Sequence, residues 1–340
     1  MKLEVARAKL DRIINISRVE MYKPIQVAEI LREFRMNSNI SPSNLETFRG
    51  LSRELRNRAS LELMGKVSTS SMRFQDDLWN ETALPASSLE VLHFANKGSK
   101  VEEYIYQHIY AKSMQVIEIR KKLQFLNSDA GIEEIFEFFD QEGLRTSADR
   151  LFEVFALAVL QTQVVLSDFK YQVTGDLSSV LGNAGKKLIS IAASQENILE
   201  LAKMGHTNAA DAGLDIWTNF GVVINVKNYT LNRELLLRVL SDTPIGILCI
   251  ICKAVSLDLN DKFKIHLKNR PVVIITREEL LKDTSVLLAD RDSSSLFMEK
   301  FIHYFDREFP LATTLEAFML NRNYIVAIPS TAEWHDIVDC

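Results

Sequence analysis

The feature that most constrains the fold is a pair of apolar runs in residues 214–227, which are interrupted by Asn219, Phe220 and Gly221. Strand-forming residues on both sides of a short turn that contains glycine are typical of a β-hairpin with a three-residue loop. Gly221 can adopt the positive φ that such a loop requires. The sequence therefore predicts two antiparallel strands that turn at Phe220.

Polar residues occur at matching positions on the two predicted strands. If the hairpin is centred on Phe220, Asp215 lies opposite Asn225 and Gly213 lies opposite Lys227. Because side chains alternate between the two faces of a strand, Asp215, Asn225 and Lys227 share one face. A carboxylate, an amide oxygen and an ammonium group close together can hold a divalent cation and polarise water against a phosphodiester. A solvent-facing polar edge of an ordinary hairpin would carry the same residue types.

Two further carboxylates could complete such a metal site. Asp211 has the same strand parity as Asp215, so it is either an alternative metal ligand or a capping residue of the turn at 208–211. Glu153 is the only charged residue in the apolar segment 151–160. Because an unpaired buried carboxylate is costly, we expect Glu153 to be paired, exposed on its face of a helix, or bound to a metal.

A basic cluster in the first part of the chain could contact nucleic acid. Three arginines in residues 53–58 are followed by Lys66 and a run of serine and threonine. Guanidinium, ammonium and hydroxyl groups are the side-chain groups that commonly bind DNA phosphates. The candidate phosphate contacts are Arg53, Arg56, Arg58, Lys66, Ser68 and Ser70. A solvated helix face would have a similar composition.

The charges are unevenly distributed along the chain, whose formal net charge is −5. Residues 1–125 contain 20 Lys+Arg and 15 Asp+Glu, whereas residues 126–340 contain 20 Lys+Arg and 30 Asp+Glu. A local basic surface can bind DNA even on a protein that is acidic overall. The charge pattern is therefore compatible with a nucleic-acid partner, although an ordinary solvated surface could produce it too.

Several classes of chemistry lack their usual motifs. The sequence has no Walker loop, dinucleotide fingerprint or Gly-x-Ser-x-Gly elbow, so we expect no nucleotide cofactor and no serine hydrolysis. Cys249 and Cys252 lie in an apolar run, where a strand would point the two thiols to opposite faces. The apolar runs at 151–160 and 245–252 are short for a bilayer, and the N-terminus does not resemble a signal peptide. We therefore expect a cytoplasmic protein without a membrane partner.

The predicted elements divide the chain into two regions. Residues 1–126 are expected to form a helical N-terminal region for DNA recognition or dimerisation, and residues 127–340 an α/β domain with a mixed β-sheet flanked by helices. Helices are predicted at 24–36, 45–64, 99–126, 131–141, 147–161, 186–204, 231–240, 277–281 and 294–305. Besides the hairpin, strands are predicted at 245–252, 263–267 and 272–275, of which the first should be buried on both faces.

This order of elements resembles the PD-(D/E)XK nuclease core over residues 145–280. That core has a helix with a glutamate, a strand with an aspartate, a hairpin, a strand that ends in x-Val-Lys, a helix and a buried apolar strand. Glu153, Asp215 and the segment 225–227 occupy the matching positions.

A narrower resemblance rests on two short segments. Residues 210–221, followed by Val226 and Lys227, and residues 18–25 are similar to type II restriction endonucleases of the HaeII kind. The resemblance implies a restriction-endonuclease-like α/β core that hydrolyses DNA.

The resemblance also implies a role for each matching residue. Asp215 would bind Mg²⁺, Lys227 would lie near the attacking water, and Glu153 or Asp211 would supply a second carboxylate. Asn225 departs from the family pattern, because that position usually carries Asp or Glu. A neutral amide supplies one oxygen and no charge, so the other carboxylates would have to compensate.

The expected function is that of a Mg²⁺-dependent, sequence-specific endonuclease that acts on double-stranded DNA. Palindromic recognition would require a homodimer, because a two-fold symmetric site needs a symmetric reader. Two alternatives remain: a structure-specific DNA repair or junction nuclease with this core, and a catalytically inactive DNA-binding scaffold. The second would be favoured by the missing acid at Asn225.

Overall fold

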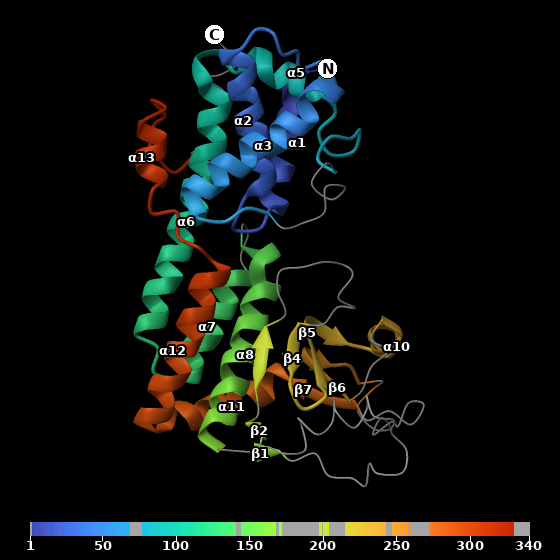
Figure 1. Cartoon of the computed structure of the whole chain (residues 1–340), viewed down its shortest axis with the longest axis vertical. Helices are drawn as coiled ribbons and strands as arrows, with labels where there is room; N and C mark the ends of the chain where they lie inside the picture. The colour runs from blue at the N-terminus through green and yellow to red at the C-terminus, as the bar shows by residue number, and fades with distance from the viewer. Residues whose placement is uncertain are drawn as a thin grey trace, which may run out of the picture. The chain divides into compact units, whose positions relative to one another are not determined.

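The structure is a computed structural model, and the chain divides into two compact units. Unit 1 comprises residues Met1–Phe125, Glu134–Ala148 and Phe305–Cys340, and unit 2 comprises Leu126–Glu133 and Asp149–Tyr304. The residues that the structure describes are 2–68, 77–140, 144–167, 170–171, 197–198, 200–203, 215–242, 247–257, 259 and 272–329. Figure 1 shows the elements of both units.

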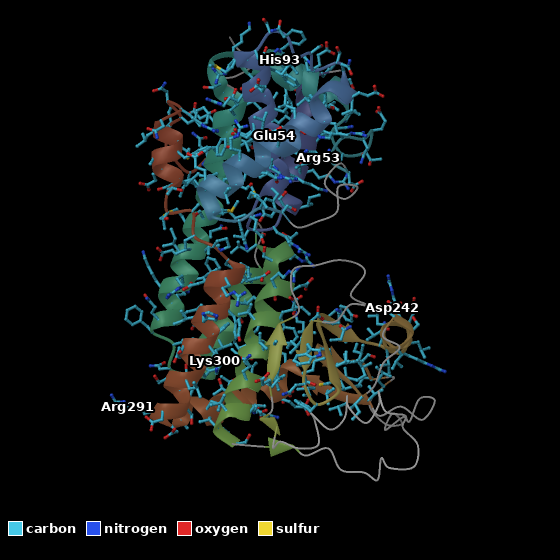
Figure 2. The ribbon with its side chains drawn as sticks, in the orientation of Figure 1. Arg53, Glu54, His93, Asp242, Arg291 and Lys300 are labelled. Carbon is cyan, nitrogen blue, oxygen red and sulfur yellow. The ribbon has the colours of Figure 1, made fainter. Side chains whose placement is uncertain are left out.

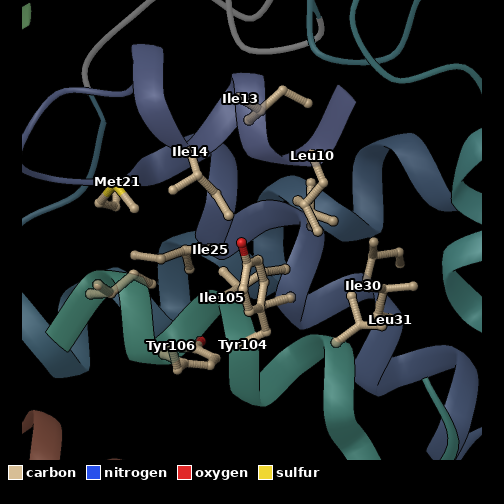
Figure 3. Close-up of a cluster of buried hydrophobic side chains, with 14 of the residues drawn as sticks. Leu10, Ile13, Ile14, Met21, Ile25, Ile30, Leu31, Tyr104, Ile105 and Tyr106 are labelled. Atoms are coloured by element: carbon tan, nitrogen blue, oxygen red, sulfur yellow. The ribbon is translucent and has the colours of Figure 1, made fainter. Parts of the chain in front are cut away.

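Unit 1 is built around a helical core. Its main helices are α1 (Leu3–Ile16), α2 (Tyr22–Met36), α3 (Leu45–Met64), α5 (Ala86–Ala95), α6 (Lys100–Gln124) and α13 (Leu315–Leu320). Leucine, isoleucine and tyrosine side chains of α1, α2 and α6 meet in the interior (Figure 3). The bounds of α3 are those predicted, because Gly65 ends the helix with a φ of 66°. The predicted helical character of the N-terminal region is confirmed.

The C-terminal part of the chain completes the core of unit 1. Leu315, Phe318, Met319 and Tyr324 belong to the same buried cluster as the N-terminal helices. Arg322 forms an ion pair with the buried Glu29 of α2, and its guanidinium lies 3.6 Å from the ring centroid of Phe318. Hydrophobic contacts and a buried ion pair therefore attach the C-terminal segment to the N-terminal helices of unit 1.

Unit 2 contains a mixed five-stranded sheet among its described residues, with the order β3-β4-β5-β6-β7 (Figure 1). The strands are β3 (Leu201–Lys203), β4 (Ile216–Thr218), β5 (Val222–Leu231), β6 (Ile247–Val255) and β7 (Val272–Thr276). The β3–β4 and β4–β5 pairs are antiparallel, and the β5–β6 and β6–β7 pairs are parallel. Ile250, Ile251 and Cys252 are fully buried, so β6 is an interior strand covered on both faces, as its apolar sequence predicts.

Helices flank this sheet, and the predicted α/β class is confirmed. They are α8 (Ala148–Ser167), α10 (Arg233–Asp242) and α11 (Arg277–Ala289), and parts of α7 (Asp129–Asp140) and α12 (Arg291–Glu308) also belong to unit 2. Phe155 of α8 packs against Phe297 and Phe301 of α12. Leu236 and Val239 of α10 pack in one cluster with residues of β5 and β6. The sheet therefore has a hydrophobic core that holds its central strands in place.

One helix is longer than its apolar run suggested. The helix over Arg145–Ser167 is long and apolar enough to cross a membrane by length and composition. Half of its most apolar part is buried, and residues 151–159 are buried without interruption. A core helix meets the same criteria, and the contacts of α8 with α12 are those of a core helix.

One predicted element, the helix at 186–204, is wrong in the part of the chain that the structure describes. Residues 197–198 and 201–203, predicted to be helical, lie in strand β2 (Asn197–Ile198) and strand β3. Strand β2 pairs with β1 (Lys170–Tyr171), and β3 pairs with β4. Non-local pairing therefore overrides the local helical pattern. The rest of the predicted helix 186–204, apart from Glu200, and the predicted strand 263–267 lie outside the described residues.

The helix predicted to start at Leu231 starts two residues later. Leu231 is the last residue of β5, and α10 begins at Arg233. Asn232 caps this helix, because its Oδ1 accepts a hydrogen bond of 2.9 Å from the backbone N–H of Leu235. Asparagine is a favoured N-cap residue, so Asn232 sets the start of α10.

Candidate active site

The hairpin has the register that its sequence predicts. Ile216 pairs with Ile224 and Trp217 with Val223, so the turn is centred on Phe220. Gly221 has a φ of 85°, in the left-handed region that favours glycine. The three-residue loop is confirmed, and so is the placement of Asp215 close to Lys227.

Asp215 is held in place by three hydrogen bonds. Its Oδ2 accepts one of 3.1 Å from Nζ of Lys227 and one of 2.7 Å from the backbone N–H of Val226. Its own backbone N–H donates to the carbonyl of Ile224 at 3.1 Å. The carboxylate therefore binds the backbone of the neighbouring strand β5 directly. Asp215 thus has a structural function in the hairpin as well as an ion pair with Lys227.

The electrostatic environment of Asp215 is unusual for an aspartate. Burial raises its pKa above the ordinary value, and the negative charge of Glu153 adds to this effect. The ammonium of Lys227 and the amide of Val226 lower the pKa but do not fully compensate. The two carboxylates therefore repel each other in a partly dry site, and a divalent cation would relieve this repulsion.

Glu153 has a partner that the sequence analysis did not identify. It lies on α8 with 9% of its surface exposed, and its Oε2 accepts a hydrogen bond of 2.8 Å from Nη1 of Arg150. Of the three states expected for this carboxylate, the structure shows the paired one. Residues three apart share a helix face, and that spacing could have identified Arg150 in advance.

Asn225 and Lys227 lie on β5, the middle strand of the sheet, next to β6. Asn225 is 3% exposed, and it is in register with Ile250 of β6. Lys227 is in register with Cys252, and the pairing with β6 becomes irregular between Lys227 and Thr230. Such bulges bend a strand and redirect side chains. The buried Asn225 offers an amide where a stronger metal site would have a carboxylate.

The described residues fit a weakly held divalent cation. Mg²⁺ typically uses one or two protein carboxylates and fills its other positions with water and substrate phosphate. Glu153 and Asp215 are two such carboxylates, coupled through their charges. No group of three or more His, Cys, Asp or Glu side chains suited to a metal occurs among the described residues. Asp211, the other predicted ligand, lies outside them.

The CxxC motif does not take part in this site. Cys249 is in register with Ile224, and Cys252 with Lys227, so the two thiols point to opposite faces of the sheet, as predicted. Burial raises the pKa of Cys249 to about 12 and that of Cys252 to about 11. Both thiols therefore stay protonated and unreactive at neutral pH.

The prediction that Arg56 contacts DNA is contradicted by its burial. Only 1% of this residue is exposed. Its guanidinium donates to Oε1 of Gln26 at 3.2 Å and to Oδ1 of Asn57 at 2.5 Å. The face of α3 that carries Arg56 packs against α2, so the guanidinium stabilises unit 1 from within.

The other predicted phosphate contacts have different surroundings. Arg58 is largely exposed and pairs with Glu54 at 3.3 Å. Figure 2 shows Arg53 and Glu54 on the same helix. Lys66 donates to the backbone carbonyl of Glu308 at 3.2 Å, so part of its hydrogen-bonding capacity is used within unit 1. Ser68 is half-buried, and Ser70 lies outside the described residues.

Comparison with known proteins gives relatives over nearly the whole chain. The sequence model of the HaeII restriction endonuclease family matches residues 6–324. The chain is 31% identical over 346 residues to the type II restriction enzyme HaeII of Haemophilus aegyptius, covering 96% of this chain and 98% of that protein. It is also 31% identical over 352 residues to the type II restriction enzyme NgoBI of Neisseria gonorrhoeae, covering 96% and 99%. No solved structure matches.

Proposed function

The chain belongs to the HaeII restriction endonuclease family, and from this we propose that it cleaves double-stranded DNA at specific sequences with Mg²⁺ as cofactor. Type II restriction enzymes are site-specific deoxyribonucleases, so the general class of reaction follows from the family. The proposal extends to the residues: Asp215, Glu153 and Lys227 form the active site of a PD-(D/E)XK-like core.

One observation carries this assignment. Lys227 Nζ lies 3.1 Å from Asp215 Oδ2 across a hairpin whose register matches the sequence prediction. The charge of a third side chain, Glu153, acts on the same aspartate although it comes from a helix 62 positions earlier in the chain (215 minus 153). A carboxylate pair with an adjacent ammonium group is the minimal set for metal-assisted phosphodiester hydrolysis.

The residues would divide the chemistry as follows. Asp215 and Glu153 would hold the Mg²⁺ ion, which, when bound, supplies Lewis acidity toward the scissile phosphate and acidifies a bound water. Lys227 provides a fixed positive charge that stabilises the negative charge developing on the phosphate oxygens. Asp215 orients this ammonium group through the 3.1 Å hydrogen bond. Arg150 keeps the carboxylate of Glu153 in position through its 2.8 Å contact.

Asn225 has a smaller role in this proposal. Its amide oxygen can contribute one neutral ligand, whereas the usual acid would add a negative charge. The charge that neutralises Mg²⁺ therefore comes from Asp215 and Glu153. Asp211 is retained as an alternative or additional ligand.

We assign recognition and assembly to other parts of the chain. Residues 1–126, together with the C-terminal segment that completes the core of unit 1, would supply DNA contacts and dimer contacts, and unit 2 would form the nuclease domain. Arg53 and Arg58 remain the proposed phosphate contacts of α3, together with Lys66, Ser68 and Ser70. A homodimer would match the symmetry of a palindromic site. Sedimentation of the protein with and without a cognate duplex tests this assembly.

Cleavage of plasmid and phage DNA tests the proposed function. With Mg²⁺, we expect a reproducible set of discrete fragments that disappears when the metal is chelated with EDTA. The same set should appear on any DNA that contains the same short sequence. A smear, cuts only at branched junctions, or a gel shift without cutting would each contradict the proposal, the last in favour of a binding scaffold.

A further inference from the structure

Trp217 is a large apolar residue on β4 whose side chain is exposed to solvent. It is 45% exposed, whereas its strand neighbours Ile216 and Thr218 are buried. Exposing an indole in the middle of a strand forgoes the stabilisation that its burial would give. The packing of the sheet therefore does not account for tryptophan at this position.

The neighbours of Trp217 leave the indole accessible. Across the sheet it is in register with Ala202 of β3 and Val223 of β5, both of which are smaller. The hydrophobic cluster under α10 includes Val223, Leu248 and Val272 from the same face, but not Trp217. Among the residues that the structure describes, the hydrophobic cluster under α10 therefore does not extend to β4, and the indole lies outside it.

Trp217 shares its face with the proposed active site. It is two residues from Asp215, so the two side chains project to the same side and lie about 7 Å apart along the strand. Successive base pairs are about 3.4 Å apart along duplex DNA. A duplex whose scissile phosphate lies at Asp215 and Lys227 would therefore bring its second or third nucleotide over Trp217.

We propose that Trp217 contacts the DNA substrate, packing its indole against the sugar and base surface about two nucleotides from the scissile phosphate. This inference rests on the proposed position of the active site at Asp215. The indole ring offers a rigid apolar surface, and its N–H can donate to a phosphate or base acceptor. Two cationic side chains at the same site, Lys227 and Arg150, would attract the phosphate backbone of the DNA that contacts Trp217.

The test measures DNA affinity without cleavage. Trp217→Ala and Trp217→Phe are made in the Asp215→Asn background, and binding of a labelled cognate duplex is followed by anisotropy with Mg²⁺. We expect alanine to weaken binding about tenfold or more, and phenylalanine to stay within about threefold, because the phenyl ring keeps a rigid apolar surface against the DNA. Val273→Ala is the matched control, since Val273 is 49% exposed on β7 but lies on the opposite face, in register with Cys249.

A spectroscopic readout supports the affinity measurement. The tryptophan emission of the otherwise unaltered protein should change when DNA is added, and this DNA-dependent change should be lost in Trp217→Phe. Thermal unfolding of each variant identifies any that fails to fold. Because phenylalanine is a conservative replacement, the emission test remains decisive even if the alanine variant is unstable.

Two results would overturn the inference. One is a DNA affinity and a DNA-dependent emission change that are the same in both Trp217 variants as in the protein that retains Trp217. The other is a change in oligomeric state by sedimentation at constant DNA affinity, which would assign Trp217 to a second copy of the chain. A wrong active-site assignment gives a different result, because Asp215→Asn would then cut DNA normally. If Asp215→Asn is inactive but the Trp217 variants bind DNA as well as the protein with Trp217, only the role of Trp217 is refuted.

Discussion

Replacement of Arg56 by alanine should destabilise unit 1 without changing how the protein contacts DNA phosphates. The guanidinium is 1% exposed and donates to Gln26 and Asn57. Hydrogen bonds from a charged group contribute about 1.5–3 kcal/mol each, and leaving the buried Gln26 oxygen without this donor adds about 1–3 kcal/mol. Allowing for non-additivity, we expect a loss of about 3–5 kcal/mol, which is typical of a broken buried charge interaction.

The assay combines equilibrium unfolding with salt-dependent DNA binding. In urea, Arg56→Ala should unfold at a clearly lower concentration than the wild type, whereas the exposed Arg58→Ala should change the unfolding free energy by less than about 0.5 kcal/mol. Each lost phosphate contact reduces the slope of log affinity against log salt by about 0.9. The slope should stay constant in Arg56→Ala and decrease in Arg58→Ala.

The reasoning about Arg56 has a definite contrary outcome. An Arg56→Ala variant that unfolds within about 1 kcal/mol of the wild type, and whose salt slope is reduced by about one, would mean that the guanidinium reaches DNA. Arg56→Met keeps much of the side-chain volume. It therefore separates lost packing from lost hydrogen bonds, and it should remain destabilised.

Three further predictions concern the hairpin. Lys227→Ala should lower the single-turnover cleavage rate by about 10²–10³ with DNA affinity within a few-fold, because a fixed charge beside the phosphate is lost; an unchanged rate contradicts this role. Asp215 has a pKa raised above 3.8, so the stability it contributes is present at low pH and lost as pH rises through the folded-state pKa. Thermal unfolding against pH should show this loss in the wild type and not in Asp215→Asn, whereas cleavage should rise over the same window; parallel stability curves would refute the assignment. Gly221→Ala should lower the free energy of unfolding by about 1–2 kcal/mol, because a Cβ at a φ of 85° strains the backbone although it meets no other atom. An unfolding free energy equal to that of the wild type would contradict this prediction.

The geometry of the hairpin could be predicted from the sequence because two local rules determine it. The loop position fixes the register, and strand alternation then fixes which side chains share a face. The ion pair between Asp215 and Lys227 follows directly from these rules. The bounds of α3 were equally accessible, since Gly65 provides a standard helix end.

Other features depend on contacts that a local pattern does not contain. The arginines of α3 have similar sequence neighbours, but packing against α2 buries Arg56 and leaves Arg58 exposed. Strand β3 exists because β4 offers it a partner, although its residues also suit a helix. The charge of Glu153 acts on Asp215 because the fold brings together two segments that are far apart in the sequence.

The most direct test of the central claim is single-turnover cleavage by Asp215→Asn beside the wild type, at saturating Mg²⁺ and with DNA binding measured on the same duplex. The variant keeps the size and shape of the side chain but removes the negative charge that would hold the metal. We predict a rate at least about 10³-fold lower, with DNA affinity essentially unchanged. Cleavage by Asp215→Asn at the wild-type rate would show that the hydrolysis takes place elsewhere in the protein.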